Sequence, residues 1–169
     1  MKGPNMQITS FKDLYITELQ ELASLEGQLV DALQRMAQAA SRSSLKNALK
    51  RHREQTQAQK QRLETILKRH GAKSQAHTDQ AMQALINETE KMIAMVKGDD
   101  LRDAALIASA QKVEHYEIAA YGVVASLAGQ LDLRDDQRLL HGSLKEEKEA
   151  DAELTKLAKS EVNQAAVVV

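Results

Sequence analysis

The chain has 169 residues, in which 23 Lys and Arg balance 24 Asp and Glu, and it contains no Cys and no Trp. The absence of Cys excludes a disulfide framework, a thiolate metal site and a catalytic cysteine. A formal net charge of −1 provides no overall basic field for a nucleic acid, so we expect no nucleic-acid partner. The length suits one domain that buries roughly 70% of the surface of its unfolded chain.

Membrane and targeting signals are missing from the sequence pattern. The longest uncharged internal run, Ile118 to Leu131, is shorter than the roughly 20 apolar residues that span a bilayer. No charged and then apolar leader opens the sequence. We therefore expect a cytoplasmic protein with no membrane partner. We expect residues 1–7 to be a disordered or vector-derived lead-in, residues 8–164 a single helical bundle domain, and residues 165–169 a C-terminal tail.

The composition favours helices throughout. Pro occurs once, Gly occurs seven times, and strong helix formers such as Ala, Leu, Gln, Glu and Lys dominate. Aromatic residues make up 2% of the chain, too few to fill a β-sandwich or barrel. These features predict an all-α protein.

Capping signals divide the chain into four long helices and a short one. Ser10 with Asp13 resembles a capping box, Ser43 or Ser44 can cap the next helix, and Gly71 can end it. In chain order, the predicted helices cover residues 11–40, 43–71, 78–97, 99–131 and 135–163. Two pairs of long helices have short connections, which predict antiparallel hairpins. The long crossover between the hairpins, with its short helix, is typical of a ferritin-like four-helix bundle.

Carboxylates interrupt the apolar stripes of three long helices near their middles. At 100° per residue, the inward acids are Glu26, Glu114, Glu117, Glu147 and Asp151. A buried carboxylate normally becomes protonated, pairs with a cation or binds a metal. The inner stripes contain no Lys or Arg beside these acids, and Arg62 only approaches an edge of the second helix. A pair of iron or manganese ions would supply the missing positive charge.

Residue counting places these acids in adjacent layers. Counting from the last turn predicts Glu114 level with Asp151, and Glu117 within one residue of Glu147. On the second helix, His52 interrupts the stripe together with Gln55, Thr56 and Gln59. Counting from the first turn puts His52 about two helical turns, roughly 10 Å, from the level of Glu26. We therefore expect His52 to be a weaker ligand candidate than the carboxylates.

Other interpretations of these residues stay open. A single carboxylate on an apolar stripe can be hydrogen-bonded or lie at a wet helix end, and Tyr121 can pack or can orient a ligand. The third long helix is apolar nearly all round, which predicts that it is enclosed on both sides. A homodimer would cover part of this helix, unless the short helix covers all of it.

Three segments carry a resemblance to a known family. The run DAALIASAQKVEHYEIAAYG from Asp103 to Gly122 closely resembles a signature of the ferritin-like family typified by the bacterial stress protein YciF. Further matches are LEGQLVDAL around Glu26 and LKEEKEADAELTKLA from Leu144 to Ala158. The resemblance implies a dimeric five-helix ferritin-like fold, a di-metal site within the bundle and a link to stress responses. The chain departs from ferritins and bacterioferritins by carrying His52-x-x-Gln55 in place of Glu-x-x-His.

Residues and resemblance together give two hypotheses for function. The first is a stress-associated protein with a di-iron or dimanganese centre that reacts with O₂ or peroxide. Its expected ligands are Glu26, His52, Glu114, Glu117, Glu147 and Asp151. The second is a non-catalytic structural or interaction protein, in which the same carboxylates are protonated or bridged by water. Whether the protein is an enzyme stays open between these hypotheses.

Overall fold

The computed structural model describes residues 7–168, and all regular secondary structure in this range is helical. The prediction of an all-α protein is therefore confirmed. Residues 1–6 of the expected lead-in and residue 169 of the expected tail lie outside the described residues. The elements are α1 (Phe11–Ala39), α2 (Ser43–Arg69), α3 (Gln80–Met95), α4 (Asp99–Gln130), α5 (Arg134–Leu157), a π-helical segment (Ala158–Val162) and α6 (Asn163–Ala166).

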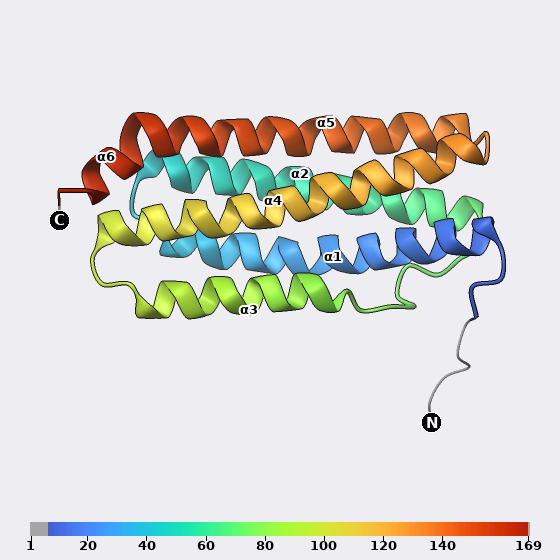
Figure 1. Cartoon of the computed structure of the whole chain (residues 1–169), viewed down its shortest axis with the longest axis horizontal. Coiled ribbons are helices and arrows are strands. Elements are labelled where there is room, and N and C mark those ends of the chain that lie inside the picture. The colour runs from blue at the N-terminus through green and yellow to red at the C-terminus, as the bar shows by residue number, and fades with distance from the viewer. Residues whose placement is uncertain (1–6, 169) are drawn as a thin grey trace, which may run out of the picture.

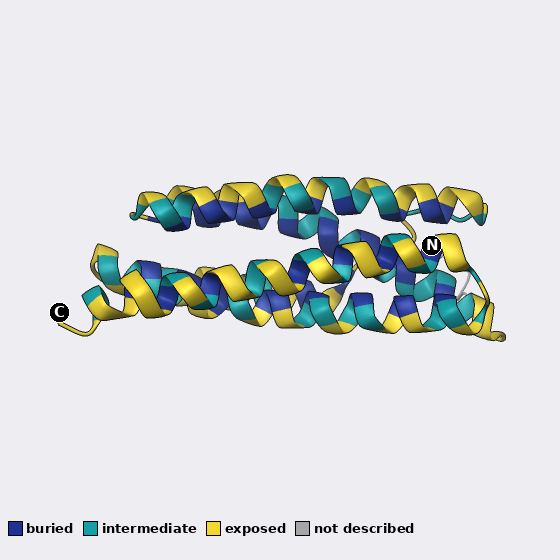
Figure 2. Cartoon of the chain, turned by 90° about the horizontal axis from the view of Figure 1, so that it is seen from above, coloured by how far each residue is buried: buried dark blue, intermediate teal, exposed yellow. Residues whose placement is uncertain are grey.

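The long helices pair along the chain and lie side by side (Figure 1). α1 packs on α2, and α4 packs on α5, while α1 also contacts α4 and α2 contacts α5. The shorter α3 packs against α1 and α4. Buried residues line the inner faces of the helices and exposed residues lie outside (Figure 2). No helix among the described residues has the length and hydropathy needed to cross a bilayer.

Helix boundaries follow the capping chemistry with small differences from expectation. Ser10 and Asp13 form the expected capping box, each side chain accepting a backbone N–H of the other. Gly71 follows α2 with a positive φ of 67°, a left-handed conformation suited to glycine. α3 begins at Gln80, two residues later than expected, because the Asp79 side chain caps it by accepting the Met82 N–H at 2.7 Å.

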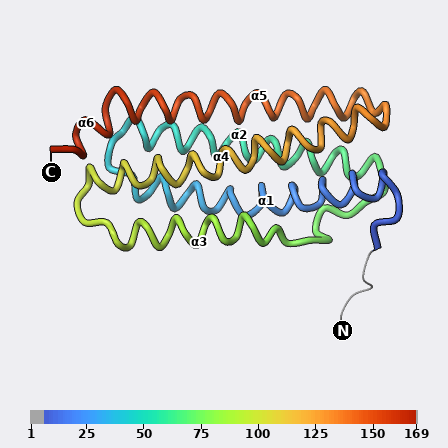
Figure 3. The backbone as a smooth tube through the Cα atoms, viewed as in Figure 1, coloured from blue at the N-terminus to red at the C-terminus, as the bar shows by residue number. Residues whose placement is uncertain are grey.

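The connection from α2 to α3 crosses α1 before α3 begins (Figure 3). Gln20 of α1 donates to the Lys73 carbonyl at 2.8 Å. Farther along α1, the Ser24 hydroxyl accepts the Asp79 N–H, and Gln28 donates to the Asp79 carbonyl, each at 3.0 Å. Polar side chains on one edge of α1 thus hold this connection in place.

A buried carboxylate joins the helices at each end of the molecule. Asp103, at the start of α4, is fully buried and accepts the backbone N–H groups of Ser41 and Arg42 at 2.7 and 2.8 Å. At the opposite end, Asp136 of α5 accepts the Tyr15 hydroxyl at 3.1 Å and lies 2.7 Å from His70 Nε2. These contacts fix where the first hairpin lies along the second. Asp103 also satisfies N–H groups of the α1–α2 turn, where neither Ser43 nor Ser44 caps α2 as expected: its N-cap is Arg42, which makes no side-chain capping bond.

Replacing Asp103 tests its role in holding the α1–α2 turn. We expect Asp103→Ala to lower the free energy of unfolding by about 3 kcal/mol, the low end for two hydrogen bonds to a charged group. The matched control is Asp99→Ala, one turn earlier at the start of α4 but with its side chain 73% exposed, which should cost less than about 0.5 kcal/mol. Urea denaturation followed by circular dichroism measures both, and equal losses would contradict this role.

Candidate metal centre

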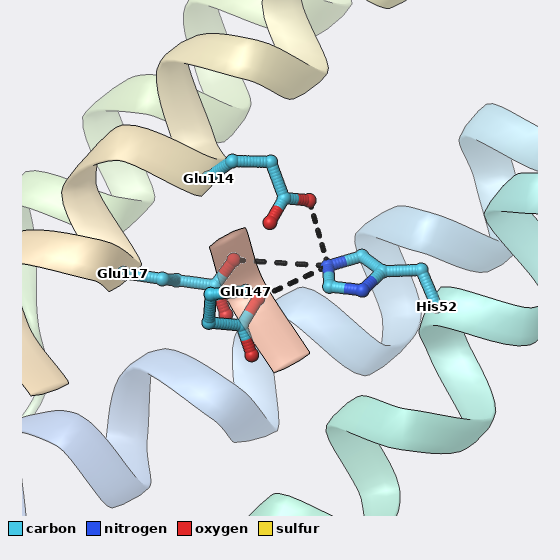
Figure 4. A group of neighbouring side chains, drawn as sticks. All are labelled: His52, Glu114, Glu117 and Glu147. Carbon is cyan, nitrogen blue, oxygen red and sulfur yellow. Dashed lines mark ion pairs between the residues drawn. The ribbon is translucent and has the colours of Figure 1, made fainter. Parts of the chain in front are cut away.

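Four buried side chains from three helices meet in the middle of the molecule (Figure 4). They are His52 of α2, Glu114 and Glu117 of α4, and Glu147 of α5, which we call the central cluster. Each residue offers one possible ligand atom, and these four atoms all lie within 4.8 Å of one another. His52 Nε2 is 2.8 Å from Glu114 Oε1, 3.7 Å from Glu147 Oε2 and 3.8 Å from Glu117 Oε2.

The central cluster holds more negative than positive charge. Its three carboxylates are at most 1% exposed, and within the described residues all their ion pairs are with the single imidazole of His52. Arg62, which the sequence placed near an edge of the second helix, donates instead to Glu146 through two nitrogens at 2.7 and 2.9 Å. One imidazole cannot balance three carboxylates, so the cluster can accommodate further positive charge.

Several polar atoms of the central cluster lack hydrogen-bond partners among the described residues. They are one oxygen of Glu114, both oxygens of Glu117 and Glu147, and both ring nitrogens of His52. His52 Nε2 is close to Glu114 but without the geometry of a hydrogen bond. Buried polar atoms in native proteins nearly always have a partner. Carboxylate oxygens with one imidazole suit an ion such as iron or manganese, so the residues present fit such a metal.

The environment of the cluster shifts the pKa values of its members. Burial raises the pKa of Glu117 to about 7; the charge of Glu114 adds to this effect and His52 opposes it. Burial, followed by the charge of Glu117, raises the pKa of Glu147 well above its ordinary range. Burial lowers the pKa of His52, but Glu114 and Glu117 outweigh burial and raise that pKa overall. Such strongly perturbed groups gather at functional sites.

Glu26 of α1 lies beside the central cluster. It is fully buried, and burial followed by the charge of Glu117 raises its pKa well above the ordinary value. One of its oxygens accepts the hydroxyl of Tyr121, and the other has no hydrogen-bond partner among the described residues. The sequence left open whether Tyr121 packs in the core or orients a ligand. In the structure its hydroxyl contacts the carboxylate of Glu26.

Asp151 is not brought into the central cluster. Its carboxylate accepts Gln111 Nε2 at 3.2 Å and lies 3.4 Å from His115 Nε2, at the α4–α5 edge, with 22% of the side chain exposed. Counting along the hairpin placed Asp151 level with Glu114. The structure turns Asp151 outward at that level, and Glu147, one helical turn earlier, is the residue of α5 that belongs to the central cluster.

The contacts of Asp103 explain why His52 reaches Glu114. α2 and α4 run in the same direction away from the end where Asp103 binds the α1–α2 turn (Figure 1). His52 follows Ser41 by eleven residues, and Glu114 follows Asp103 by eleven, so the two side chains lie at one level. His52 lies closer to the α1–α2 turn than Glu26 does. Glu114 and Glu117 lie about one turn apart on α4, so Glu114 can contact His52 while Glu117 lies near Glu26. Our ranking of His52 below the carboxylates is therefore not supported by its position.

Fold and cluster together define a class: an all-helical protein with a buried group of carboxylates and histidine between its long helices. The model of the family described as a domain of unknown function, DUF892, matches residues 10–167. The chain therefore belongs to the DUF892 family.

Known proteins agree with this assignment and confirm the resemblance seen in the sequence. Protein YciF of Escherichia coli K12 is 41% identical over 162 residues, which cover 95% of this chain and 98% of YciF. The crystal structure of the E. coli stress protein YciF superposes with a TM-score of 0.88 and covers 92% of this chain and 99% of that one. YcfI of Rhodopseudomonas palustris, proposed to be a structural protein, is 34% identical with a TM-score of 0.86, covering 89% of this chain and 96% of that one.

The raised pKa of Glu117 predicts how pH affects the stability of the metal-free protein. Between pH 4.5 and about 7, folded Glu117 keeps a proton that the unfolded chain loses, so stability falls as the pH rises through this window. Each pH unit in this window lowers the free energy of unfolding by about 1.4 kcal/mol. At pH 8 we therefore expect the metal-free Glu117→Gln variant to be more stable than the unsubstituted protein by about 3 kcal/mol. At pH 4 the two proteins should converge.

Urea denaturation in the presence of a chelator measures this difference. Glu149→Gln on α5, whose side chain is 62% exposed, is the control and should change stability little at either pH. A Glu117→Gln variant that is less stable than the unsubstituted protein at pH 8 would contradict the account of a buried, uncompensated charge.

Proposed function

We propose that this chain is a cytoplasmic, homodimeric ferritin-like protein of the stress response that binds a pair of iron or manganese ions. In this proposal α1, α2, α4 and α5 form the four-helix bundle and α3 is the crossover helix. The metal ions are held between the long helices by the central cluster together with Glu26. The observation that carries the proposal is the excess of buried carboxylates, most of whose oxygens have no hydrogen-bond partner among the described residues.

The arrangement of the side chains supports two ions rather than one. His52 and Glu114 lie at one level, and Glu26 lies farther along the helix axes, where it accepts the hydroxyl of Tyr121. Glu117 and Glu147 are close enough to His52, Glu114 and Glu26 for these groups to affect one another's pKa. Glu117 and Glu147 would therefore help to hold both ions of the pair. We leave Asp151 outside the proposed ligand set because it contacts Gln111 and His115 instead.

The proposed metal pair supplies redox chemistry toward O₂ or peroxide. The protein contributes a site from which bulk water is largely excluded, because the carboxylates are at most 1% exposed. The Tyr121 hydroxyl donates to Glu26 and so fixes the orientation of that carboxylate. Thr56 donates to the His52 carbonyl at 2.9 Å, which helps to hold this turn of α2 beneath the imidazole.

A structural role without metal is the second candidate, favoured by the relative YcfI, which is proposed to be a structural protein. In that case the raised pKa values would leave some of the carboxylates protonated in the folded protein. The two candidates differ in one measurable property, because only a metal-binding protein gains stability when iron or manganese is added.

Metal content and thermal stability test the proposal together. Protein purified without a nickel column and loaded anaerobically with Fe²⁺ or Mn²⁺ should bind about two ions per chain. The ions should raise the melting temperature. We expect Glu114→Gln to lose at least half of the bound metal, because the substitution removes a charged ligand from the central cluster.

Asp151→Asn is the matched control, because it alters a carboxylate near the cluster but outside the proposed ligand set. It should keep the full metal content. Less than about a tenth of a metal ion per chain under both loading conditions would contradict the proposal. Melting temperatures unchanged by either metal would favour the structural role.

A further inference from the structure

A small opening between α2 and α5 reaches the central cluster. Its volume of about 10 Å³ is on the order of the space that one water molecule needs. His52 and Glu114 line its inner side, and Gln55 and Glu153 line it as well. Of the cluster's side chains, His52 keeps the largest exposure, 7%, and it is the one beside this opening.

Two alanines account for the opening. Ala48 of α2 and Ala150 of α5 face the gap from opposite sides, and their methyl groups leave room that larger side chains would fill. Ala150 lies one turn after Glu147 on α5, and Ala48 lies one turn before His52 on α2. The two alanines therefore lie about one turn from the cluster, and His52 and Glu114 line the inner side of the gap.

The neighbouring seams are closed by polar contacts. Farther along the same α2–α5 seam, Arg62 donates to Glu146 and, at 3.1 Å, to Ser143. Gln59 also donates to Glu146, at 3.0 Å. Across the α4–α5 seam, Gln111 donates to both Asp151 and Thr155. The gap beside Ala48 and Ala150, which we call the alanine gap, is lined instead by the buried Leu49 and Leu154 and by the exposed Glu153.

The carboxylate of Glu153 at the outer end of the gap can attract cations. Glu153 pairs with Arg51 of α2, and the side chains are 43% and 57% exposed. An exposed pair of this kind contributes little to stability and can separate readily. When Arg51 swings away, the Glu153 carboxylate is free to contact a cation before the cation reaches His52 and Glu114.

We propose that metal ions reach the central cluster through the alanine gap between α2 and α5, with Glu153 as the first carboxylate they contact. This inference rests on the proposed metal-binding function, and it adds the route and a positioning residue outside the ligand set. His52 is then the first member of the central cluster to meet the ion. Its Nδ1 and Nε2 are both buried beside the gap, and neither has a hydrogen-bond partner among the described residues.

The rate of metal uptake tests the route. Co²⁺ is mixed with the full-length metal-free protein, and its visible absorption is followed by stopped flow. We expect Ala150→Leu to slow uptake by about tenfold, or about 1.4 kcal/mol on the barrier, while the final metal content stays the same. The control Ala152→Leu, on the exposed side of the same helix, should load at the rate of the unsubstituted protein.

A second variant covers the case in which Ala150→Leu does not fold. Glu153→Gln leaves Arg51 as an unpaired cation at the outer end, so we expect slower uptake at low salt. Added salt should restore the rate, because the Debye length shortens from about 30 Å at 0.01 M to about 10 Å at 0.1 M. If the folded Ala150→Leu variant, or Glu153→Gln in its place, loads as fast as the unsubstituted protein, the route is wrong.

Failure of the route is distinguishable from failure of the proposed function. An unsubstituted protein that binds no Co²⁺, Fe²⁺ or Mn²⁺ at equilibrium overturns both. A protein that binds metal fully, with uptake unaffected by Ala150→Leu, overturns the route alone.

Discussion

The uncompensated burial of carboxylates is the constraint on which this structure depends. Glu26, Glu114, Glu117 and Glu147 are all at most 1% exposed, and His52 is the only base paired with them among the described residues. A metal-free fold must tolerate this charge by protonation, which explains the raised pKa values of Glu26, Glu117 and Glu147. The buried carboxylates therefore lower the free energy of unfolding of the metal-free protein, and a cation bound at the centre of the molecule would raise it again.

The ends of the molecule position this centre. Asp103 joins the α1–α2 turn to the start of α4, and Asp136 joins α5 to Tyr15 and His70. A helix is rigid at 1.5 Å per residue, so two helices held at one end stay in register along their length. The contact of His52 with Glu114 is therefore a consequence of hydrogen bonds made eleven residues away.

Helix content and the inward acids could be predicted from the sequence, because both follow from local propensity and a period of 3.6 residues. The capping box at Ser10 shows this, as do Glu114 and Glu117 on the buried face of α4. The position of His52 could not, because it depends on the stagger between the two hairpins. That stagger is set by Asp103, whose partners lie about 60 residues away in the chain. Asp151 turns outward because Gln111 and His115 offer it partners at the edge.

An anomalous-scattering map from crystals loaded with iron or manganese tests the central claim most directly. Data collected on either side of the absorption edge of each metal identify the ion and its ligands at once. The account predicts two peaks between α1, α2, α4 and α5, bound by His52 Nε2 and by the carboxylates of Glu26, Glu114, Glu117 and Glu147. The absence of any peak there, or a peak only at the exposed edge beside His115 and Asp151, would contradict it.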